Sequence, residues 1–399
     1  MPGQKLHILQ ITNRLPWPLN DGGNLAAWNV GNGLVKIGHD VTLASLNTKK
    51  HFVKDSEVPG YTKIHSVFLN TDPSNLQALL HLFSSIPYNI SRFQSAAFGR
   101  MLEKTVTENQ FNIIQLEGIY LGIYLPVIRK FFKGKVILRA HNVEHRIWKR
   151  MAAAEKNIVK KWYFNHLAKG IERFEKNILN DFDALVPIST DDAAWFSENG
   201  FSGKMQPIPG GAEILPEVKP GAHKKKNAIC FIGSLEWLPN VEGVDWFLAN
   251  IWPKILEQVP DCEFHLAGKN PPEKYSQMQI PGFHFWGEVA DAGKFMDPFS
   301  VMVIPLLSGS GMRMKAVEAM GRGLAVVGTP VGLEGIPGTS GLHFLSENTE
   351  KGIARHIIEV LKNPHLLENI SREGHTFARE NYSWEKLVKR FEELYFALK

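Results

Sequence analysis

The stretch "VMVIPLLSGSGMRMKAVEAMGRGLAVVGT", residues 301–329, decides the fold. Its pattern predicts a buried strand, a glycine-rich loop, a helix and a second buried strand. A strand, a crossover helix and another strand form a βαβ unit of a parallel sheet. Arg313 and Lys315 stand in the expected first turn of the helix, where partly positive backbone amides disfavour cations. The stretch therefore raises the question of which negative group offsets them.

The same alternation of strands and helices occurs twice along the chain. A stretch rich in proline, glycine and lysine, 216–227, separates the two sets, as at many domain boundaries. We expect an α/β fold of two Rossmann-like, doubly wound domains facing a cleft, 1–215 and 216–380, with a C-terminal helix, 381–399, packing back on the first domain. Strands are expected at 5–12, 40–46, 63–69, 112–118, 135–140 and 184–189, then at 227–233, 262–268, 283–288, 301–307 and 324–329.

Composition places the chain among ordinary globular proteins. Its 399 residues are 44% hydrophobic and 21% charged. Cys230 and Cys262 lie in apolar runs, so two buried thiols are expected rather than a disulfide. The N-terminus lacks the apolar run of a signal peptide, and no apolar stretch approaches the roughly 20 residues of a spanning helix. We therefore expect a soluble, cytoplasmic protein.

The positive charge is concentrated in one segment, 145–180. There nine cationic residues face three glutamates, while the whole chain carries a net charge of +5. Two interpretations remain open: a solvated helical face, or an electropositive surface for an anionic substrate or the inner face of an anionic membrane. The cationic residues are Arg146, Lys149, Arg150, Lys156, Lys160, Lys161, Lys169, Arg173 and Lys176.

Ligands of open α/β sheets bind beyond the carboxyl ends of the strands, so the residues that follow each strand are the candidates. Gly22 and Gly23 precede a helix after the first strand, where bare backbone can approach a phosphate or simply turn. His141 directly follows the fifth strand and is either a ligand-binding or a structural histidine. In the second domain, Gly233, Ser234 and Lys269 follow strands in the same way.

The glycine loop at 309–311 has the strongest signal. Its backbone, with Arg313 and Lys315 just beyond, matches the donors that a phosphate or diphosphate requires. Glu318 is an acceptor suited to the vicinal hydroxyls of a ribose. The alternative is a surface ion pair between Lys315 and Glu318, which would contribute under about 1 kcal/mol and leave Arg313 and the glycine loop without a role.

The C-terminal half resembles the retaining GT-B glycosyltransferases of group 1, or family 4. The resemblance rests on "FIGSLEWLPNVEGVDWFLANIWPKILEQVPDCEFHLAGKNPP", "FWGEV", "EAMGRGLAVVGT" and the terminal "SWEKL", and more loosely on "LPWPLNDGG", "GHDVTL", "RAHNVEH" and "ALVPIS" in the first half. It implies that a nucleotide-diphosphate sugar binds mainly to the second domain. By resemblance, Glu318 would hold the ribose, Arg313 and Lys315 would neutralise the leaving diphosphate, and His141 would contact the donor.

Two positions depart from the family pattern. Ser310 stands where relatives commonly have a glutamate that contacts the transferred sugar, so the sugar stays open. The stretch "GSLEWLPNVEG" lacks the Arg/Lys pair found in many members, and we expect Arg313 and Lys315 to take over that duty.

These observations predict a glycosyltransferase that moves a sugar from a nucleotide sugar to a glycan, glycolipid or other acceptor with retention, in cell-surface polysaccharide or glycolipid synthesis. No metal or other cofactor is expected, because Asp181 and Asp183 lie at a helix–strand junction and protein cations can neutralise the leaving group. The catalytic candidates are Arg313, Lys315 and His141. The donor-binding candidates are Gly22, Gly23, Gly233, Ser234, Lys269, Gly309, Ser310, Gly311, Glu318 and Glu334, and the acceptor candidates are Arg14, Trp17, Asn142, Glu144 and His145.

Two alternatives share the fold: a sugar-nucleotide 2-epimerase and a catalytically inactive binding subunit. The epimerase would need carboxylates placed for acid–base work at the sugar, and the sequence offers no convincing set. A nicotinamide-dependent oxidoreductase is disfavoured because no G-x-G-x-x-G follows the first strand. Nucleic-acid binding is disfavoured because the basic segment carries no recognition motif.

Overall fold

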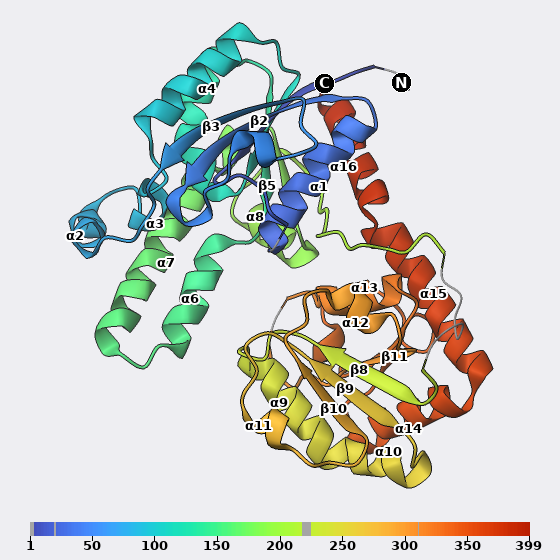
Figure 1. Cartoon of the computed structure of the whole chain (residues 1–399). Coiled ribbons are helices and arrows are strands. Elements are labelled where there is room, and N and C mark those ends of the chain that lie inside the picture. Colours follow the sequence, from blue (N-terminus) through green and yellow to red (C-terminus); the bar gives the residue numbers. More distant parts are fainter. Residues whose placement is uncertain (1–3, 20, 218–224, 310) are drawn as a thin grey trace. The chain divides into compact units, whose positions relative to one another are not determined.

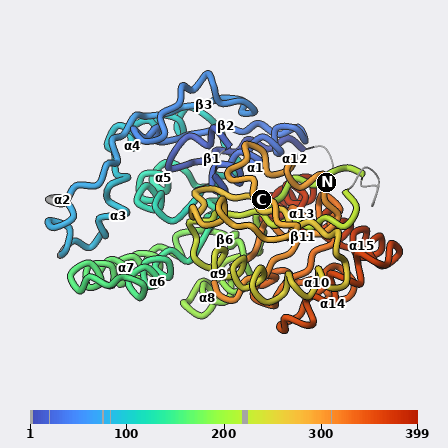
Figure 2. Tube along the Cα trace, turned by 60° about the horizontal axis from the view of Figure 1, so that its bottom comes forward, coloured from blue at the N-terminus to red at the C-terminus, as the bar shows by residue number. Residues whose placement is uncertain are grey.

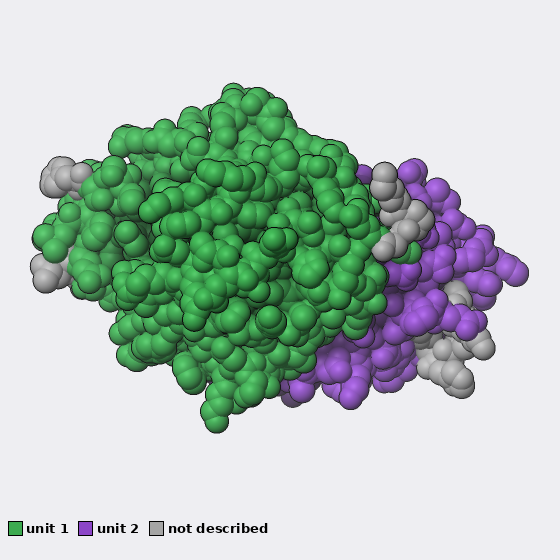
Figure 3. Space-filling model, turned by 90° about the horizontal axis from the view of Figure 1, so that it is seen from above, with its two compact units in different colours: residues 1–210, 387–399 green, residues 211–386 purple. Residues whose placement is uncertain are grey.

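The computed structural model describes residues 4–19, 21–217, 225–309 and 311–399. It divides into two compact units, which Figure 3 colours separately. Unit 1 comprises 1–210 and 387–399, and unit 2 comprises 211–386. Unit 2 thus begins at 211, where the sequence led us to expect 216. Most of the expected linker, 218–224, lies outside the described residues.

Unit 1 is built on a parallel sheet of seven strands in the order β3-β2-β1-β4-β5-β6-β7 (Figure 1). All residues of β1 except the first are buried, as expected for a strand covered on both faces. The direction of the strand order reverses between β1 and β4, so this point is the switch point of the sheet. The strands are β1 (His7–Thr12), β2 (Asp40–Thr48), β3 (Lys63–Leu69), β4 (Ile113–Glu117), β5 (Lys135–Ala140), β6 (Ala184–Pro187) and β7 (Lys204–Met205).

The helices of unit 1 include a long antiparallel pair, α6 and α7, which lie side by side in Figures 1 and 2. The chain ends in α16 (Trp384–Leu398), whose residues from 387 onward belong to unit 1. The other helices are α1 (Gly22–Lys36), α2 (Asn75–Leu80), α3 (Tyr88–Ser91), α4 (Ala96–Glu108), α5 (Leu125–Phe131), α6 (Glu144–Ala154), α7 (Ile158–Ile178) and α8 (Thr190–Glu198).

The terminal helix supplies part of the unit 1 core. Phe391 is fully buried and its ring lies 5.1 Å from the guanidinium carbon of buried Arg139. The hydroxyl of Tyr395 donates a hydrogen bond to Gln115 of β4, and both side chains are buried. Apolar residues at helical spacing therefore pack α16 against the sheet, and the buried hydrogen bond between Tyr395 and Gln115 adds a polar contact between them.

Unit 2 repeats the design with six parallel strands in the order β10-β9-β8-β11-β12-β13, and its switch point lies between β8 and β11. The strands are β8 (Ala228–Ile232), β9 (Glu263–Ala267), β10 (Phe283–Gly287), β11 (Val301–Ile304), β12 (Ala325–Gly328) and β13 (Leu345–Ser346). The helices are α9 (Leu238–Trp246), α10 (Trp252–Gln258), α11 (Lys274–Gln277), α12 (Ala292–Met296), α13 (Met314–Gly321), α14 (Glu350–Lys362) and α15 (Pro364–Tyr382), with a π-helical turn, Phe247–Ile251, between α9 and α10.

The predicted α/β class with two parallel sheets is confirmed, and each of the eleven expected strands overlaps an observed one. The two strands that the sequence did not reveal, β7 and β13, have two residues each and lie at sheet edges. Runs this short carry no detectable alternation, because side-chain periodicity needs about four residues.

Candidate functional site

The strongest candidate site lies at the switch point of unit 2. The loop after β11 and the residues after β8 meet there at the carboxyl edge of the sheet. Helix α13 begins at Met314, so Lys315 is in its first turn, but Arg313 is the N-cap residue rather than a first-turn residue. No acidic side chain caps the helix or stands in its first turn. Both cations therefore face a helix start that lacks a carboxylate of its own.

Lys315 is held by tertiary contacts rather than by Glu318. Its Nζ donates to Asn240 Oδ1 at 2.8 Å and lies 4.3 Å from the centre of the Phe231 ring. Burial, and then the charge of Arg313, lower the pKa of Lys315 to about 7, against the opposing effect of Glu318. The described structure contains no ion pair between Lys315 and Glu318, so the surface-pair interpretation is not what the chain adopts.

Asn240 and Gly233 position this ammonium. The Asn240 side chain is 2% exposed, and its amide donates to the Ser234 carbonyl at 2.7 Å. A methyl group on Gly233 would lie 2.9 Å from the Asn240 amide nitrogen and would also collide with the Lys315 Nζ. A side chain at this position would therefore displace the lysine ammonium or the asparagine amide. The Ser234 hydroxyl oxygen is buried and has no hydrogen-bond partner among the described residues, so it is available to a ligand.

Arg313 lies across an aromatic side chain beside the glycine loop. Its guanidinium carbon is 5.2 Å from the Trp237 ring, and Nη2 is 3.8 Å from Glu334 Oε2. Burial lowers the pKa of Arg313, while Glu334 opposes the shift. Gly309 has φ +108°, and a Cβ there would come within 2.9 Å of both Arg313 and Trp237. The loop therefore needs glycine for conformation and for space.

The remaining sugar-donor-binding candidates of unit 2 differ from one another in burial and in contacts. Glu318 is half-buried and makes no side-chain hydrogen bond in the part of the chain described. Burial raises the pKa of Glu318, and the negative charge of Glu213 raises it further, while Arg322 and Lys315 lower it. Gly311 has φ +90° with open space around it. Lys269 and Glu334 are exposed, and Ser310 lies outside the described residues.

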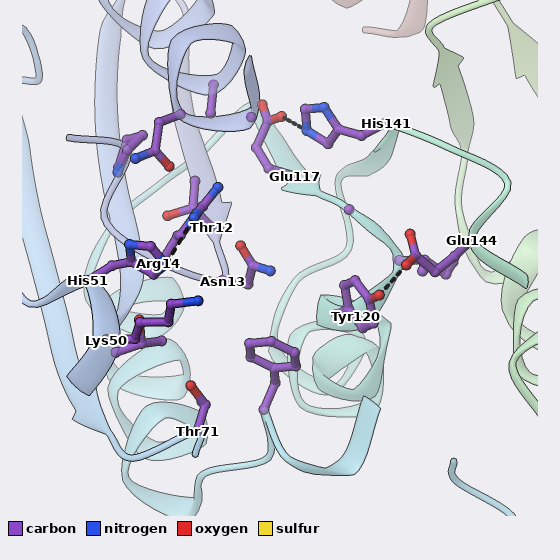
Figure 4. A pocket seen from close by; sticks show the side chains of 18 of the residues that line it. Thr12, Asn13, Arg14, Lys50, His51, Thr71, Glu117, Tyr120, His141 and Glu144 are labelled. Atoms are coloured by element: carbon purple, nitrogen blue, oxygen red, sulfur yellow. Dashed lines mark hydrogen bonds and ion pairs between the residues drawn. The ribbon is translucent and has the colours of Figure 1, made fainter. Parts of the chain in front are cut away.

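Unit 1 has its own pocket of about 330 Å³ at the carboxyl ends of β1, β4 and β5 (Figure 4). His141 lines it and its Nε2 lies 2.9 Å from Glu117 Oε2. Burial alone would raise the pKa of Glu117, but Arg139, His141 and Gln10 together lower it to about 2. An ionised Glu117 fixes the imidazole at the pocket wall, which places His141 among the ligand-facing histidines rather than in the core.

The glycine pair of unit 1 is arranged differently from the prediction. Gly22 and Gly23 open α1, but the Asp21 carboxylate accepts from the amides of Gly23 and Asn24 at 3.0 and 3.1 Å. Arg14 Nη2 binds the same carboxylate oxygen at 2.6 Å. A side chain of the protein thus already supplies the anion that we expected a phosphate to provide at this helix start.

The acceptor candidates separate into two groups. Arg14, Asn142 and Glu144 line the pocket, and the Tyr120 hydroxyl donates to Glu144. Trp17 lies instead against the small apolar cluster around Leu15. His145 is 2% exposed; its Nδ1 lies 2.6 Å from Glu175 Oε2 and its ring packs on Trp195. The structure therefore gives His145 a structural place, and we withdraw it as an acceptor residue.

Two groups resemble metal sites by their residue types. Asp183 binds Arg129 and Lys135 at 2.7 and 3.4 Å and accepts from the Val136 amide, so its oxygens are occupied. Glu263, His265 and His284 lie within ligand distance of one another. Because Trp286 Nε1 donates to His265 Nδ1, the ring proton lies on Nε2 and faces Glu263 at 2.8 Å. This geometry fits a hydrogen-bonded network.

Sequence reasoning missed Asn240 and Trp237, which hold the two cations. Both lie in "GSLEWLPNVEG", a stretch that contains no cation. A tryptophan and an asparagine in this stretch indicate that the segment positions the two cations and does not contribute charges of its own.

Comparison with known proteins fits this geometry. Residues 226–363 match the family model described as "Glycosyl transferases group 1". This segment is therefore similar to the group 1 glycosyltransferases. An uncharacterized 44.6 kDa protein in the cps region of Klebsiella pneumoniae is 23% identical over 396 residues, 95% of this chain and 97% of that protein.

Solved glycosyltransferase structures share the fold over the whole length. Sucrose-phosphate synthase of Thermosynechococcus elongatus is 17% identical with a TM-score of 0.66, covering 99% of both chains. HepE of Anabaena, solved in complex with UDP-glucose, is 12% identical with a TM-score of 0.56, covering 98% of this chain and 100% of that one. The chain thus has the GT-B fold of these glycosyltransferases. Over the described residues, every helix is either too short or too polar to cross a bilayer.

Proposed function

We propose that this glycosyltransferase transfers a hexose from a nucleoside-diphosphate sugar to a glycan or lipid-linked acceptor with retention of configuration, in the synthesis of a cell-surface polysaccharide or glycolipid. The observation that carries the proposal is the pair of cations, Arg313 and Lys315, held by Trp237 and Asn240 at an acid-free helix start. The relative in a cps region supports the biological role.

The leaving group is the diphosphate. Negative charge develops on it as the bond to the anomeric carbon breaks, and preorganised cations and amides lower the energy of that state. Arg313 and Lys315 contact its oxygens, the Ser234 hydroxyl donates to it, and Glu318 accepts from the ribose hydroxyls. The acceptor oxygen bonds to the anomeric carbon on the departing face, and its proton passes to the leaving phosphate oxygen. This scheme needs no metal ion and no other cofactor.

Unit 1 supplies the acceptor side. His141, oriented by Glu117, contacts the donor sugar or its phosphate, while Arg14, Asn142 and Glu144 contact the acceptor. We do not extend the donor role to the amides of Gly23 and Asn24, because Asp21 already occupies them.

The test begins with a thermal-shift screen of nucleotide sugars, because a ligand that binds the folded state raises its stability by mass action. Arg313→Ala should then lower the rate of transfer by about 100-fold or more. The matched control is Arg372→Ala, an exposed arginine in α15 of the same unit, which should keep the rate of the parent protein. Near-normal turnover by Arg313→Ala with an unchanged circular dichroism spectrum would refute the leaving-group role.

The same incubation separates the alternatives. An epimerase would convert the nucleotide sugar to its C2 epimer, which proton NMR resolves from the free nucleotide that transfer releases. An inactive binding subunit would bind the donor without releasing free nucleotide, even by slow hydrolysis in the absence of acceptor. Addition of a chelator should leave the rate of transfer unchanged.

Peripheral contact with an anionic membrane is a further part of the proposal. The tip of the α6–α7 pair exposes apolar side chains of Ile158, Val159 and Trp162, with exposed fractions of 82%, 73% and 57%. Three lysines surround them in sequence, as in helices that lie at a membrane surface: Lys156, Lys160 and Lys161. Sedimentation with anionic vesicles at low salt, and its loss with neutral vesicles, tests this contact; equal sedimentation with both would contradict it.

A further inference from the structure

One side of the unit 1 pocket gathers basic side chains, which we call the basic wall: Arg14, Lys50, His51 and Arg92. Arg14 follows β1, while Lys50 and His51 form the turn after β2. Arg92 is the residue after α3, and its guanidinium carbon lies 5.2 Å from the Phe93 ring. In Figure 4, Arg14, Lys50 and His51 lie across the pocket from His141, Tyr120 and Glu144.

Most of this positive charge is not neutralised within the protein. Arg14 pairs with Asp21, whereas Lys50 and Arg92 form no direct ion pair among the described residues; Arg92 lies close enough to Asp72 to help lower the pKa of that carboxyl. The neighbouring Lys49, in contrast, points to a partner and binds Asp72 at 2.7 Å. The Arg92 Nε is buried and has no hydrogen-bond partner in the structure described. Such a nitrogen can donate a hydrogen bond to a ligand or to a water molecule.

The acidic residues across the pocket do not offset the basic wall, because they are already engaged. Glu117 binds Gln10, Arg139 and His141. Glu144 accepts from Tyr120, and burial raises its pKa. The pKa of His51 is lowered first by burial and then by the positive charges of Arg14 and Lys50, while Asp21 opposes the shift. Its Nε2 lies 3.4 Å from Arg14 Nη1.

We propose that this pocket binds a sugar acceptor that carries a negatively charged group, either a carboxylate or a phosphate, and that the basic wall holds this group. The inference rests on the proposed transferase function and names the chemical class of its acceptor. The anion would accept a hydrogen bond from Arg92 and form an ion pair with Lys50. The uncharged part of the acceptor would lie toward Tyr120 and His141. Guanidinium and ammonium groups are the side chains that bind such anions.

A titration of His51 tests the site without any transfer reaction. Its imidazole signal is identified by its loss in His51→Gln, and its pKa is measured by NMR in the full chain. Methyl glucuronide supplies a carboxylate, glucose 6-phosphate supplies a phosphate, and methyl glucoside is the neutral control. A rise of the His51 pKa with the first or the second probe, but not with the third, supports the proposal and tells which anion is preferred. No rise with either anion, or the same rise in Lys50→Met, would overturn it.

Kinetics provide the second test once a donor is found. Lys50→Met should raise KM for an acidic acceptor by about 10-fold and leave kcat close to that of the parent protein, because one charge-assisted contact is lost in binding. The matched control is Lys49→Met, whose lysine lies next door and does not line the pocket. If Lys50→Met raises KM for the donor instead, the acceptor assignment is wrong. If no nucleotide sugar supports transfer, the proposed function fails while the His51 titration still decides the anion site.

Discussion

Lys315→Met should stabilise unit 2 while it impairs transfer. The folded protein holds Lys315 at a pKa of about 7, against an ordinary 10.5. Between these pH values the unfolded chain keeps the proton and the folded chain does not, so this group makes stability rise with pH across the window. Methionine keeps the apolar stem over Phe231 and removes the charge. The gain should therefore be largest below pH 7 and shrink toward pH 10.5.

The magnitude follows from the same numbers. The separation of the two pKa values corresponds to a ceiling of about 5 kcal/mol at low pH, at roughly 1.4 kcal/mol per pH unit. The substitution also removes the hydrogen bond to Asn240 and the contact of the ammonium with Phe231, and each loss lowers the gain in stability by about 1 kcal/mol. We expect a net gain of about 3 kcal/mol at pH 6, or about 6–12 °C in Tm for a unit of this size.

The assay is urea and thermal unfolding of the full chain at pH 6 and pH 9, with Lys351→Met as the control. Lys351 is an exposed lysine on α14, and its replacement should change the free energy of unfolding by less than about 0.5 kcal/mol. Transfer by Lys315→Met should fall because the leaving group loses one cation. A loss of stability at pH 6, or an equal gain at both pH values, would refute the reasoning.

Three further changes test separate parts of the structure. Gly233→Ala should weaken UDP binding, measured by calorimetry, by about 10-fold, because the methyl group would press on the Asn240 amide; unchanged affinity would show that this packing is not needed. Glu318→Gln should weaken donor binding and remove its decline at acid pH, since the pKa of the carboxyl is raised and only the ionised form accepts from both ribose hydroxyls with both oxygens, whereas glutamine offers a single acceptor oxygen; a persisting acid decline would assign it to another group. Tyr395→Phe should lower the free energy of unfolding of unit 1 by about 1–3 kcal/mol, because it leaves buried Gln115 without its donor; an unchanged urea midpoint would contradict this.

The sequence predicted what is local in the fold. Strands, helices and the loops between them follow from hydrophobic periodicity and glycine, so the positions of Gly309, Arg313 and Glu318 at the edge of a parallel sheet were foreseeable. The topology places the residues after β8 and β11 together, because the carboxyl ends of parallel strands share one edge.

Contacts between distant residues were not foreseeable. Lys315 meets Asn240, 75 positions away, and no local pattern announces this bond. Asp21 received no role from the sequence, yet its carboxylate caps the helix start that was a candidate for contact with a phosphate. His145 follows a strand end closely enough to resemble a ligand, but helix α7 brings Glu175 against it and buries both. In each case a tertiary partner, rather than the residue's own neighbours, decides the role.

The return of α16 to unit 1 fixes an order of events during synthesis. The sheet of unit 1 is complete once residue 205 has been made, but Leu387, Phe391 and Tyr395 are the last part of its core to arrive. Until then Arg139 and Gln115 stay open to water on that face. Unit 2 is translated in between and folds as an independent body. The unit made first is therefore finished last, and a ribosome stalled after residue 386 holds one sheet without its terminal helix.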